Sequence, residues 1–194
     1  MTVFPARLVA CAIAGLAMHS AALAQAAWKD GGGKPVQESE SMRSSHGFAG
    51  AVLATTDEDW RAKWETPPKT RPSFTMADSV PYGKKVFILT LFSNPQLDEA
   101  GKASIRCDIR VQSPAGKVVL EQKDQDCYAG PIQGNKFNLR LSGPVIGFSG
   151  DPGDPPGKWS VMVNLRDTLR KVELPCRLRS TSSSGSLHET RCEW

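Results

Sequence analysis

The sequence predicts a mainly β protein, an antiparallel β-sandwich preceded by a short N-terminal helix. In the second half of the chain, apolar and polar residues alternate with period two, the pattern of strands with one buried face. Turn residues separate these stretches at short intervals, which is typical of sandwiches. The composition also changes near residue 80, from polar to strand-rich. We therefore divide the chain into a signal peptide (1–24), a polar N-terminal segment (25–79) and a sandwich domain with a Ser-rich C-terminal tail (80–194).

The N-terminus has the three parts of a secretory signal peptide. Arg7 is its only charged residue, an apolar run follows over 8–24, and Ala-x-Ala cleavage sites end at Ala24 and Ala26. A membrane-spanning anchor is the alternative. It is disfavoured because a span needs about 20 strongly apolar residues, and this run is rich in weakly apolar alanine. We expect an exported protein with a periplasmic or secreted location.

A short helix is predicted near residues 57–65. Thr56 with an acidic residue three positions later is a capping-box pattern, and the Thr-Pro-Pro run at 66–68 ends the helix. Trp60 and Trp64 stand four residues apart, so a helix places both rings on one face. We expect both rings to pack on the sandwich; the alternative is a patch that binds a partner.

The strands are predicted from their apolar patterns. A continuous apolar run over 86–92 indicates a strand that is buried on both faces. The later strands alternate, which indicates one face in the core and one in water. A turn at 113–116 joins two of them, and a loop at 154–157 precedes the clearest pair. The predicted strands cover residues 48–53, 86–92, 104–111, 117–121, 137–141, 145–148, 159–165 and 172–178.

Two local motifs suggest a closer relationship. One is the run Pro-Gly-x-Trp-x-Val-x-Val at 156–163, followed by Asp167, and the other is the strand–Pro-x-Gly-Lys–strand unit around 114–117. Both resemble features of bacterial extracytoplasmic immunoglobulin-like sandwich domains. The resemblance covers residues 80–180, implies an immunoglobulin-like fold and carries no catalytic residues.

Four cysteines remain after the signal peptide, and none forms the Cys-x-x-Cys pair of zinc sites or thioredoxin-like motifs. In an exported domain they predict two disulfides, with three possible connectivities. We predict Cys107–Cys127, because the chain returns toward the first strand after a turn. We predict Cys176–Cys192, because the Ser-rich stretch lets the chain fold back. A Cys107–Cys176 bridge between the sheets is the alternative.

The charge balance is mild. Lys and Arg number 24 and Asp and Glu 20, so the formal net charge is +4, and loss of Arg7 with the signal peptide lowers it by one. This balance gives no reason to expect a nucleic-acid partner. No later apolar stretch is long enough to span a membrane, and no motif predicts a cofactor.

No catalytic or metal-binding constellation is visible in the sequence. Ser45 precedes His46, but adjacency in sequence is not the geometry that nucleophilic catalysis requires. The pairs Asp124/Asp126 and Asp151/Asp154 could offer oxygen ligands to calcium. Their place in turns explains them better, because aspartate hydrogen bonds favour turns.

The strongest candidate for a binding surface is the row Arg106, Asp108 and Arg110. Alternation places all three on the wet face of one strand, while the residues between them face the core. Simple solvation of the sheet face is the alternative. Trp60 and Trp64 form the second candidate surface.

These observations favour a non-enzymatic exported module that binds another protein in the periplasm. An inhibitor or immunity protein is one concrete form of that hypothesis. One alternative is a carbohydrate- or envelope-binding module that uses exposed tryptophans. Another is a hydrolase whose acids are distant in sequence and meet across a cleft.

Overall fold

The computed structural model of the chain describes residues 28–29, 33–66, 72–80 and 82–182. The predicted signal peptide (1–24) and Cys192 lie outside the described residues, as does the C-terminal tail beyond residue 182.

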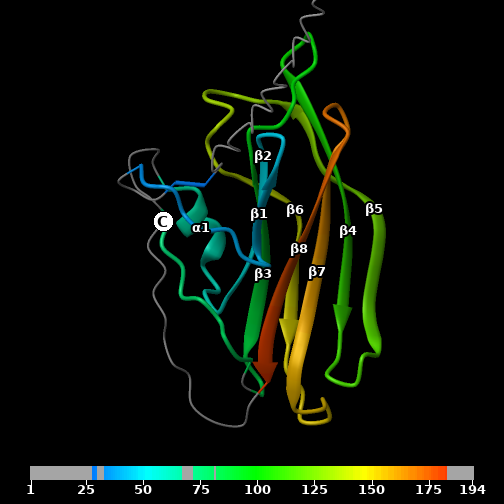
Figure 1. Ribbon diagram of the computed structural model, residues 1–194. Helices are drawn as coiled ribbons and strands as arrows, with labels where there is room; N and C mark the ends of the chain where they lie inside the picture. Colours follow the sequence, from blue (N-terminus) through cyan, green and yellow to red (C-terminus); the bar gives the residue numbers. More distant parts are fainter. Residues whose placement is uncertain (1–27, 30–32, 67–71, 81, 183–194) are drawn as a thin grey trace, which may run out of the picture.

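The strands form two four-stranded sheets that face each other (Figure 1). The first sheet has the order β1-β2-β3-β6 and the second has the order β5-β4-β7-β8. All neighbouring strands are antiparallel, which confirms the predicted fold class. The elements are β1 (Met42–Ser45), β2 (Phe48–Thr55), α1 (Trp60–Trp64), β3 (Lys85–Ser93), β4 (Lys102–Gln112), β5 (Val118–Pro131), β6 (Arg140–Ser149), β7 (Gly157–Asp167) and β8 (Val172–Ser182).

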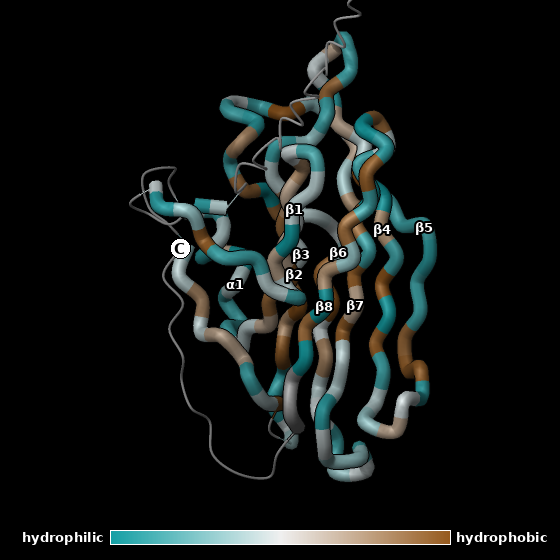
Figure 2. The backbone as a smooth tube through the Cα atoms, viewed as in Figure 1, coloured by the Kyte–Doolittle hydropathy of each residue, from teal (hydrophilic) through white to brown (hydrophobic). Residues whose placement is uncertain are grey.

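The main core lies between the two sheets, and period-two alternation decides which residues fill it. In β4, Ile105, Cys107 and Ile109 are buried, whereas Arg106 and Asp108 between them are partly exposed. Figure 2 shows the same alternation of hydrophobic and hydrophilic residues along β4 and β7. Apolar surface removed from water contributes about 25 cal/mol per Å², so this shared core is the main contact that holds the sheets together.

The first sheet has a second buried face, which the N-terminal segment and α1 cover (Figure 1). In β3, Ile88 faces the core between the sheets and Leu89 faces the second cluster. Trp28, Trp60 and Phe74 of the covering segment pack against this outer face. The prediction that this strand is buried on both faces is confirmed, because the first sheet is the middle of three layers.

The sandwich begins earlier in the chain than the division at residue 80 assumes. β1 and β2 both precede residue 80, yet they form half of the first sheet, and β2 pairs with β3 along its length. Every residue of β2 is buried. The strand predicted at 48–53 is confirmed as β2, but the polar average of residues 25–79 placed it outside the sandwich domain.

The helix is shorter than the predicted span of 57–65, and its capping box does not form. Asp59 precedes α1 without a side-chain capping hydrogen bond. The carboxylate of Asp57 instead accepts a hydrogen bond from the Thr75 N–H at 2.8 Å and lies 2.9 Å from Lys63 Nζ. These contacts tie α1 to the segment beside it, so the helix is held by its neighbours rather than by a cap.

Two other strands differ in extent from the prediction. β5 continues to residue 131 instead of ending at 121, and the two strands predicted at 137–141 and 145–148 form one strand, β6, over 140–149. Phe137 and Leu139 are 62% and 37% exposed in the loop before β6. Their alternation therefore does not mark a buried face, because the chain there has no partner strand.

Candidate functional site

The predicted row lies on the outer face of the second sheet, as the alternation in β4 requires. β5 flanks β4 on one side and β7 on the other, so the register places Asp126 and Arg166 beside Arg106. Arg110 is exposed, whereas Arg106 and Asp108 are partly covered by their neighbours. Arg106, Asp108 and Arg110 therefore lie on the outer face of β4, between β5 and β7.

Asp124 is the centre of a charge network on this face. Its carboxylate accepts hydrogen bonds from Arg106 Nε at 2.9 Å and from Arg166 Nη2 at 3.0 Å. Its backbone N–H donates to Asp108 Oδ1 at 2.7 Å. Arg106 also pairs with Asp126, and Arg166 pairs with Asp108. Three carboxylates thereby hold two guanidinium groups in place.

A β-bulge brings Asp124 to this position. The register between β4 and β5 shifts between Cys107 and Ile109, and Asp124 has a φ of 51°. A positive φ is uncommon for residues other than glycine, although aspartate adopts it more readily than most. Bulges re-aim side chains at the edge of a sheet. Here β5 is an edge strand, and its bulged residue directs its N–H and carboxylate toward β4.

The arginines keep these carboxylates ionised. Hydrogen bonding from Arg166 lowers the pKa of Asp108 below its ordinary value of 3.8, and hydrogen bonding from Arg106 lowers the pKa of Asp124. The same contacts raise the pKa of both guanidinium groups. Near neutral pH the network therefore carries fixed charges, which suits recognition of a charged partner better than proton transfer.

The other end of this face carries three outward arginines against one outward carboxylate, Glu121 of β5, which lies opposite Arg110 in the register. The register places Met162 between Arg110 and Arg177, and Arg179 is the next outward residue along β8. Arg179 pairs with Glu40 at 3.2 Å. Within the described residues, neither Arg110 nor Arg177 has a carboxylate within ion-pair distance.

We call this surface the bipolar face. Its end with the paired charge network and its arginine-rich end come from strands that are distant in sequence, so the sequence alone shows the residues but not their convergence. These residues lie on one surface only because of the order of the strands in the sheet, and no local sequence motif predicts that order. The bipolar face consists of Arg106, Asp108, Arg110, Asp124, Asp126, Arg166, Arg177 and Arg179.

The two predicted tryptophans lie away from the bipolar face, against the first sheet. Trp60 is 8% exposed, and the centroid of its ring lies 6.2 Å from that of Phe87. Trp64 is half-buried at the margin of the same cluster. The structure therefore does not bring the tryptophans together with Arg106, and their burial fits the packing interpretation.

The disulfide Cys107–Cys127 is confirmed, with a Cα–Cα distance of 5.8 Å between adjacent strands of the second sheet. Cys176 is buried, its Sγ lies 3.5 Å from the Gly50 carbonyl oxygen, and burial raises the pKa of its thiol to about 11. The alternative bridge between Cys107 and Cys176 is not formed. Cys192 lies outside the described residues, so the pairing Cys176–Cys192 stays a prediction.

The carboxylate pairs have other roles than holding a cation. Asp124 and Asp126 lie within strand β5 rather than in the predicted turn, and both accept hydrogen bonds from Arg106. Asp151 and Asp154 form a turn in which Asp154 Oδ2 accepts a hydrogen bond from the Asp151 N–H at 2.9 Å. Over the part of the chain that the structure describes, no group of three or more His, Cys, Asp or Glu side chains could hold a metal ion.

Comparison with known proteins adds little to this geometry. No family model matches the sequence, and no curated protein matches it. Among solved structures, the chain is similar to a family 123 glycoside hydrolase from Clostridium perfringens, with 6% sequence identity and a TM-score of 0.40. The match covers 69% of this chain and 27% of the hydrolase, so the chain spans about a quarter of that protein's length. The closer resemblance to immunoglobulin-like domains stays a prediction.

Proposed function

We propose that this chain is a non-enzymatic module that binds another protein, and that the bipolar face is its contact surface. The observation that carries the proposal is the unequal covering of the two sheets. The N-terminal segment and α1 cover the outer face of the first sheet. Within the described residues, no element packs over the outer face of the second sheet, which presents ordered charge instead.

The order of the charges supports recognition of one partner in one orientation. Arg106 and Arg166 are held by carboxylates before any partner arrives, so binding loses less side-chain entropy at those positions. A network of paired charges at one end and excess arginine at the other favour a partner with a complementary charge pattern. Nucleic acid is a poorer fit, because Asp108, Asp124 and Asp126 repel a phosphate backbone.

The non-enzymatic part of the proposal rests on the chemistry near the one histidine that the structure describes. His46 lies in the turn between β1 and β2, and its carbonyl oxygen accepts a hydrogen bond from Arg170. Ser45 pairs with Phe48 across the same turn. This local role accounts for both residues without a nucleophile and its base.

An extracytoplasmic location fits the cysteine chemistry. The Cys107–Cys127 disulfide is of the kind that persists in oxidising compartments, and the predicted signal peptide points the same way. Within the described residues, no helix has the length and apolar character needed to cross a membrane. An inhibitor or immunity protein of the periplasm is the concrete form that we propose.

The test is charge reversal at the arginine-rich end. A partner is first identified by crosslinking the mature protein in an extracytoplasmic extract. Its affinity for the wild type is then compared with that for Arg110→Glu/Arg177→Glu by titration calorimetry at two salt concentrations. We expect at least a roughly tenfold loss of affinity, and a larger loss at low salt, because exposed charges are screened within about 10 Å at 0.1 M.

The matched control reverses two charges elsewhere. Lys84→Glu/Lys85→Glu alters exposed residues at the start of β3, in the first sheet. This variant should bind the partner as the wild type does. Arg106 is left intact in both variants, because a glutamate there would stand beside Asp124 and Asp126 and disturb the network itself. Equal affinity of the wild type and the variant at the arginine-rich end would remove the bipolar face from the interface.

A further inference from the structure

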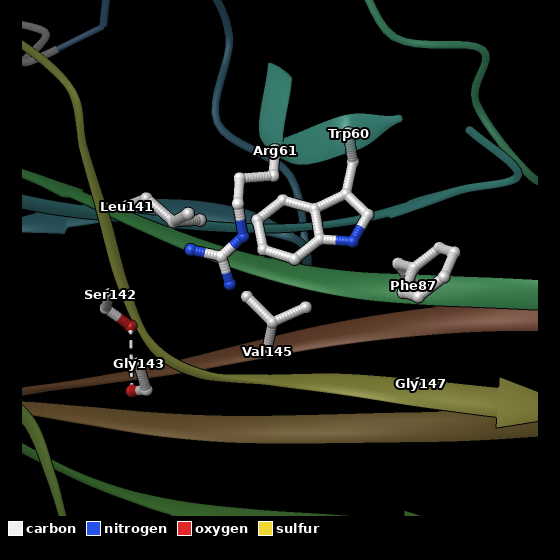
Figure 3. Close-up of a pocket in the computed structure, with 8 residues that line it drawn as sticks. All are labelled: Trp60, Arg61, Phe87, Leu141, Ser142, Gly143, Val145 and Gly147. Carbon is white, nitrogen blue, oxygen red and sulfur yellow. Dashed lines mark hydrogen bonds between the residues drawn. The ribbon is translucent and has the colours of Figure 1, made fainter. Parts of the chain in front are cut away.

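We propose that the hollow between α1 and β6 binds a small organic carboxylate with an apolar ring or a branched apolar body. The hollow lies on the outer face of the first sheet, away from the bipolar face, and has a volume of about 390 Å³. This volume is within the range of ordinary ligand sites, which is about 300–1,000 Å³. Figure 3 shows the eight residues that line it: Trp60, Arg61, Phe87, Leu141, Ser142, Gly143, Val145 and Gly147.

The hollow exists because β6 lacks side chains where the covering layer ends. β6 is one of the two edge strands of the first sheet. A Cβ added at Gly143 would meet no atom within 4 Å, and one added at Gly147 would meet only Phe87, at 3.7 Å. Neither glycine has a positive φ, so no backbone strain explains their presence. The missing side chains leave the space open beside α1.

The floor of the hollow is apolar. Phe87, Leu141 and Val145 are partly buried and pack against the second hydrophobic cluster, with the ring of Trp60 as one wall. Alternation turns these side chains outward, while Ile146 faces the core between the sheets. An apolar ligand body that displaces water from this floor gains the hydrophobic free energy of the buried area.

Arg61 supplies a positive charge over this floor. Its Cζ lies 4.9 Å from the centroid of the Trp60 ring, a cation–π contact that holds the guanidinium in place. Across the described residues, no carboxylate lies within 4.0 Å of this guanidinium. Its N–H groups are thus available as a planar fork, the geometry that binds a carboxylate with two parallel hydrogen bonds.

The charge and the walls together select the ligand class. One guanidinium balances one negative charge, so a monoanionic carboxylate fits better than a dianionic phosphate. A neutral sugar fits poorly, because Arg61 already lies over the Trp60 ring on which a sugar would stack. A carboxylate on a ring or branched chain places its charge at Arg61 and its body on Phe87, Leu141 and Val145.

The first test is a titration of the isotope-labelled protein, followed by NMR, with phenylacetate as the probe. We expect saturable shifts at the Trp60 indole N–H and at the backbone amides of Arg61, Phe87, Gly143 and Gly147. Phenylacetamide, which has the same shape without the charge, should bind at least about tenfold more weakly, since charge-assisted hydrogen bonds are about twice as strong as neutral ones. Acetate, which lacks the apolar body, should also bind more weakly.

Two variants test the two halves of the site. Arg61→Gln should raise the dissociation constant for phenylacetate at least about tenfold, and Gly147→Leu should abolish binding by filling the space. Arg43→Gln, on the opposite edge strand β1, and Gly153→Leu are the matched controls, which remove the same charge and add the same side chain elsewhere. Both controls should bind phenylacetate as the wild type does. If Gly147→Leu does not fold, the proposal is tested by the affinity of Arg61→Gln for phenylacetate and by the affinity of the wild type for phenylacetamide.

Several results would overturn the proposal. They are equal binding of phenylacetate and phenylacetamide, unchanged affinity in Arg61→Gln, or shifts that appear only outside the hollow. None of these measurements depends on the bipolar face, so the outcomes for the two sites are independent.

Discussion

Asp167 shows how one buried charge joins three separate connections of the fold. Its side chain is fully buried, and its carboxylate accepts hydrogen bonds from the Gln96 N–H at 2.7 Å and the Arg170 N–H at 3.0 Å. The Arg170 guanidinium lies 3.4 Å from the same carboxylate and donates to the carbonyl oxygens of Asn94 and His46. The Asp167–Arg170 ion pair therefore links the turn between β1 and β2, the connection between β3 and β4, and the turn between β7 and β8.

Removing Asp167 should be among the most damaging single changes. Asp167→Ala leaves Arg170 without its countercharge, and breaking a buried pair on one side costs about 3–5 kcal/mol. The free energy of unfolding, measured by urea titration, should fall by that amount. Asp59→Ala is the control, because the Asp59 side chain is 64% exposed in its pair with Lys63, and such pairs contribute about 0–1 kcal/mol. Similar losses in both variants would show that the Asp167 pair has no special role.

At the scale of the element, α1 is stable because of what it packs against. A helix of five residues is far too short to be stable alone in water. Trp60 packs on Phe87 of the first sheet, and Asp57 links the residues before α1 to Lys63 and to Thr75. The helix thus depends on the sheet that it covers.

Trp60→Ala should remove most of this packing. Large aromatic truncations in a core cost about 3–5 kcal/mol, because they lose transfer free energy and leave a cavity. The control is Ala62→Gly, which changes helix propensity at an exposed position and costs about 1 kcal/mol. Thermal unfolding followed by near-ultraviolet circular dichroism measures both variants. A loss for Trp60→Ala no larger than that for Ala62→Gly would contradict the packing role.

At the scale of the whole molecule, the charge network makes stability depend on acid. Hydrogen bonding to arginine lowers the pKa of Asp108 and of Asp124 in the folded state. For Asp57, burial acts to raise the pKa, but hydrogen bonds from Lys63 and Thr75 outweigh it and lower the pKa overall. All three carboxylates therefore bind protons more weakly in the folded chain than in the unfolded chain.

This linkage predicts acid destabilisation with a defined sign. A carboxylate whose folded pKa is lowered stabilises the fold above its unfolded pKa of about 3.9, and this stabilisation is lost as the pH falls through the folded value. The urea midpoint should therefore decline from about pH 5 downward. In Asp108→Asn the decline should be shallower, with a lower midpoint at neutral pH. An identical pH profile in the variant would show that Asp108 does not contribute to the linkage.

Local patterns predicted the features of this protein that depend on neighbouring residues. Period-two alternation identified the core side of β4, including Cys107, because a strand turns successive side chains to opposite faces. The disulfide to Cys127 followed from the same hairpin, because antiparallel strands joined by a short turn return beside each other. The two-sided burial of β3 followed from its continuous apolar run.

Contacts between distant segments decided the rest. Arg106, Asp124 and Arg166 meet only because β4 lies between β5 and β7, and strand order depends on packing across the whole sandwich. Trp60 is buried because the first sheet lies beneath it. The hollow at Gly147 is open because β6 lies at an edge of that sheet. By itself the sequence therefore determined which face of most strands is buried, since that is a local property of the backbone. The tertiary structure alone decided which charges converge and which surfaces stay open, since those depend on segments far apart in the chain.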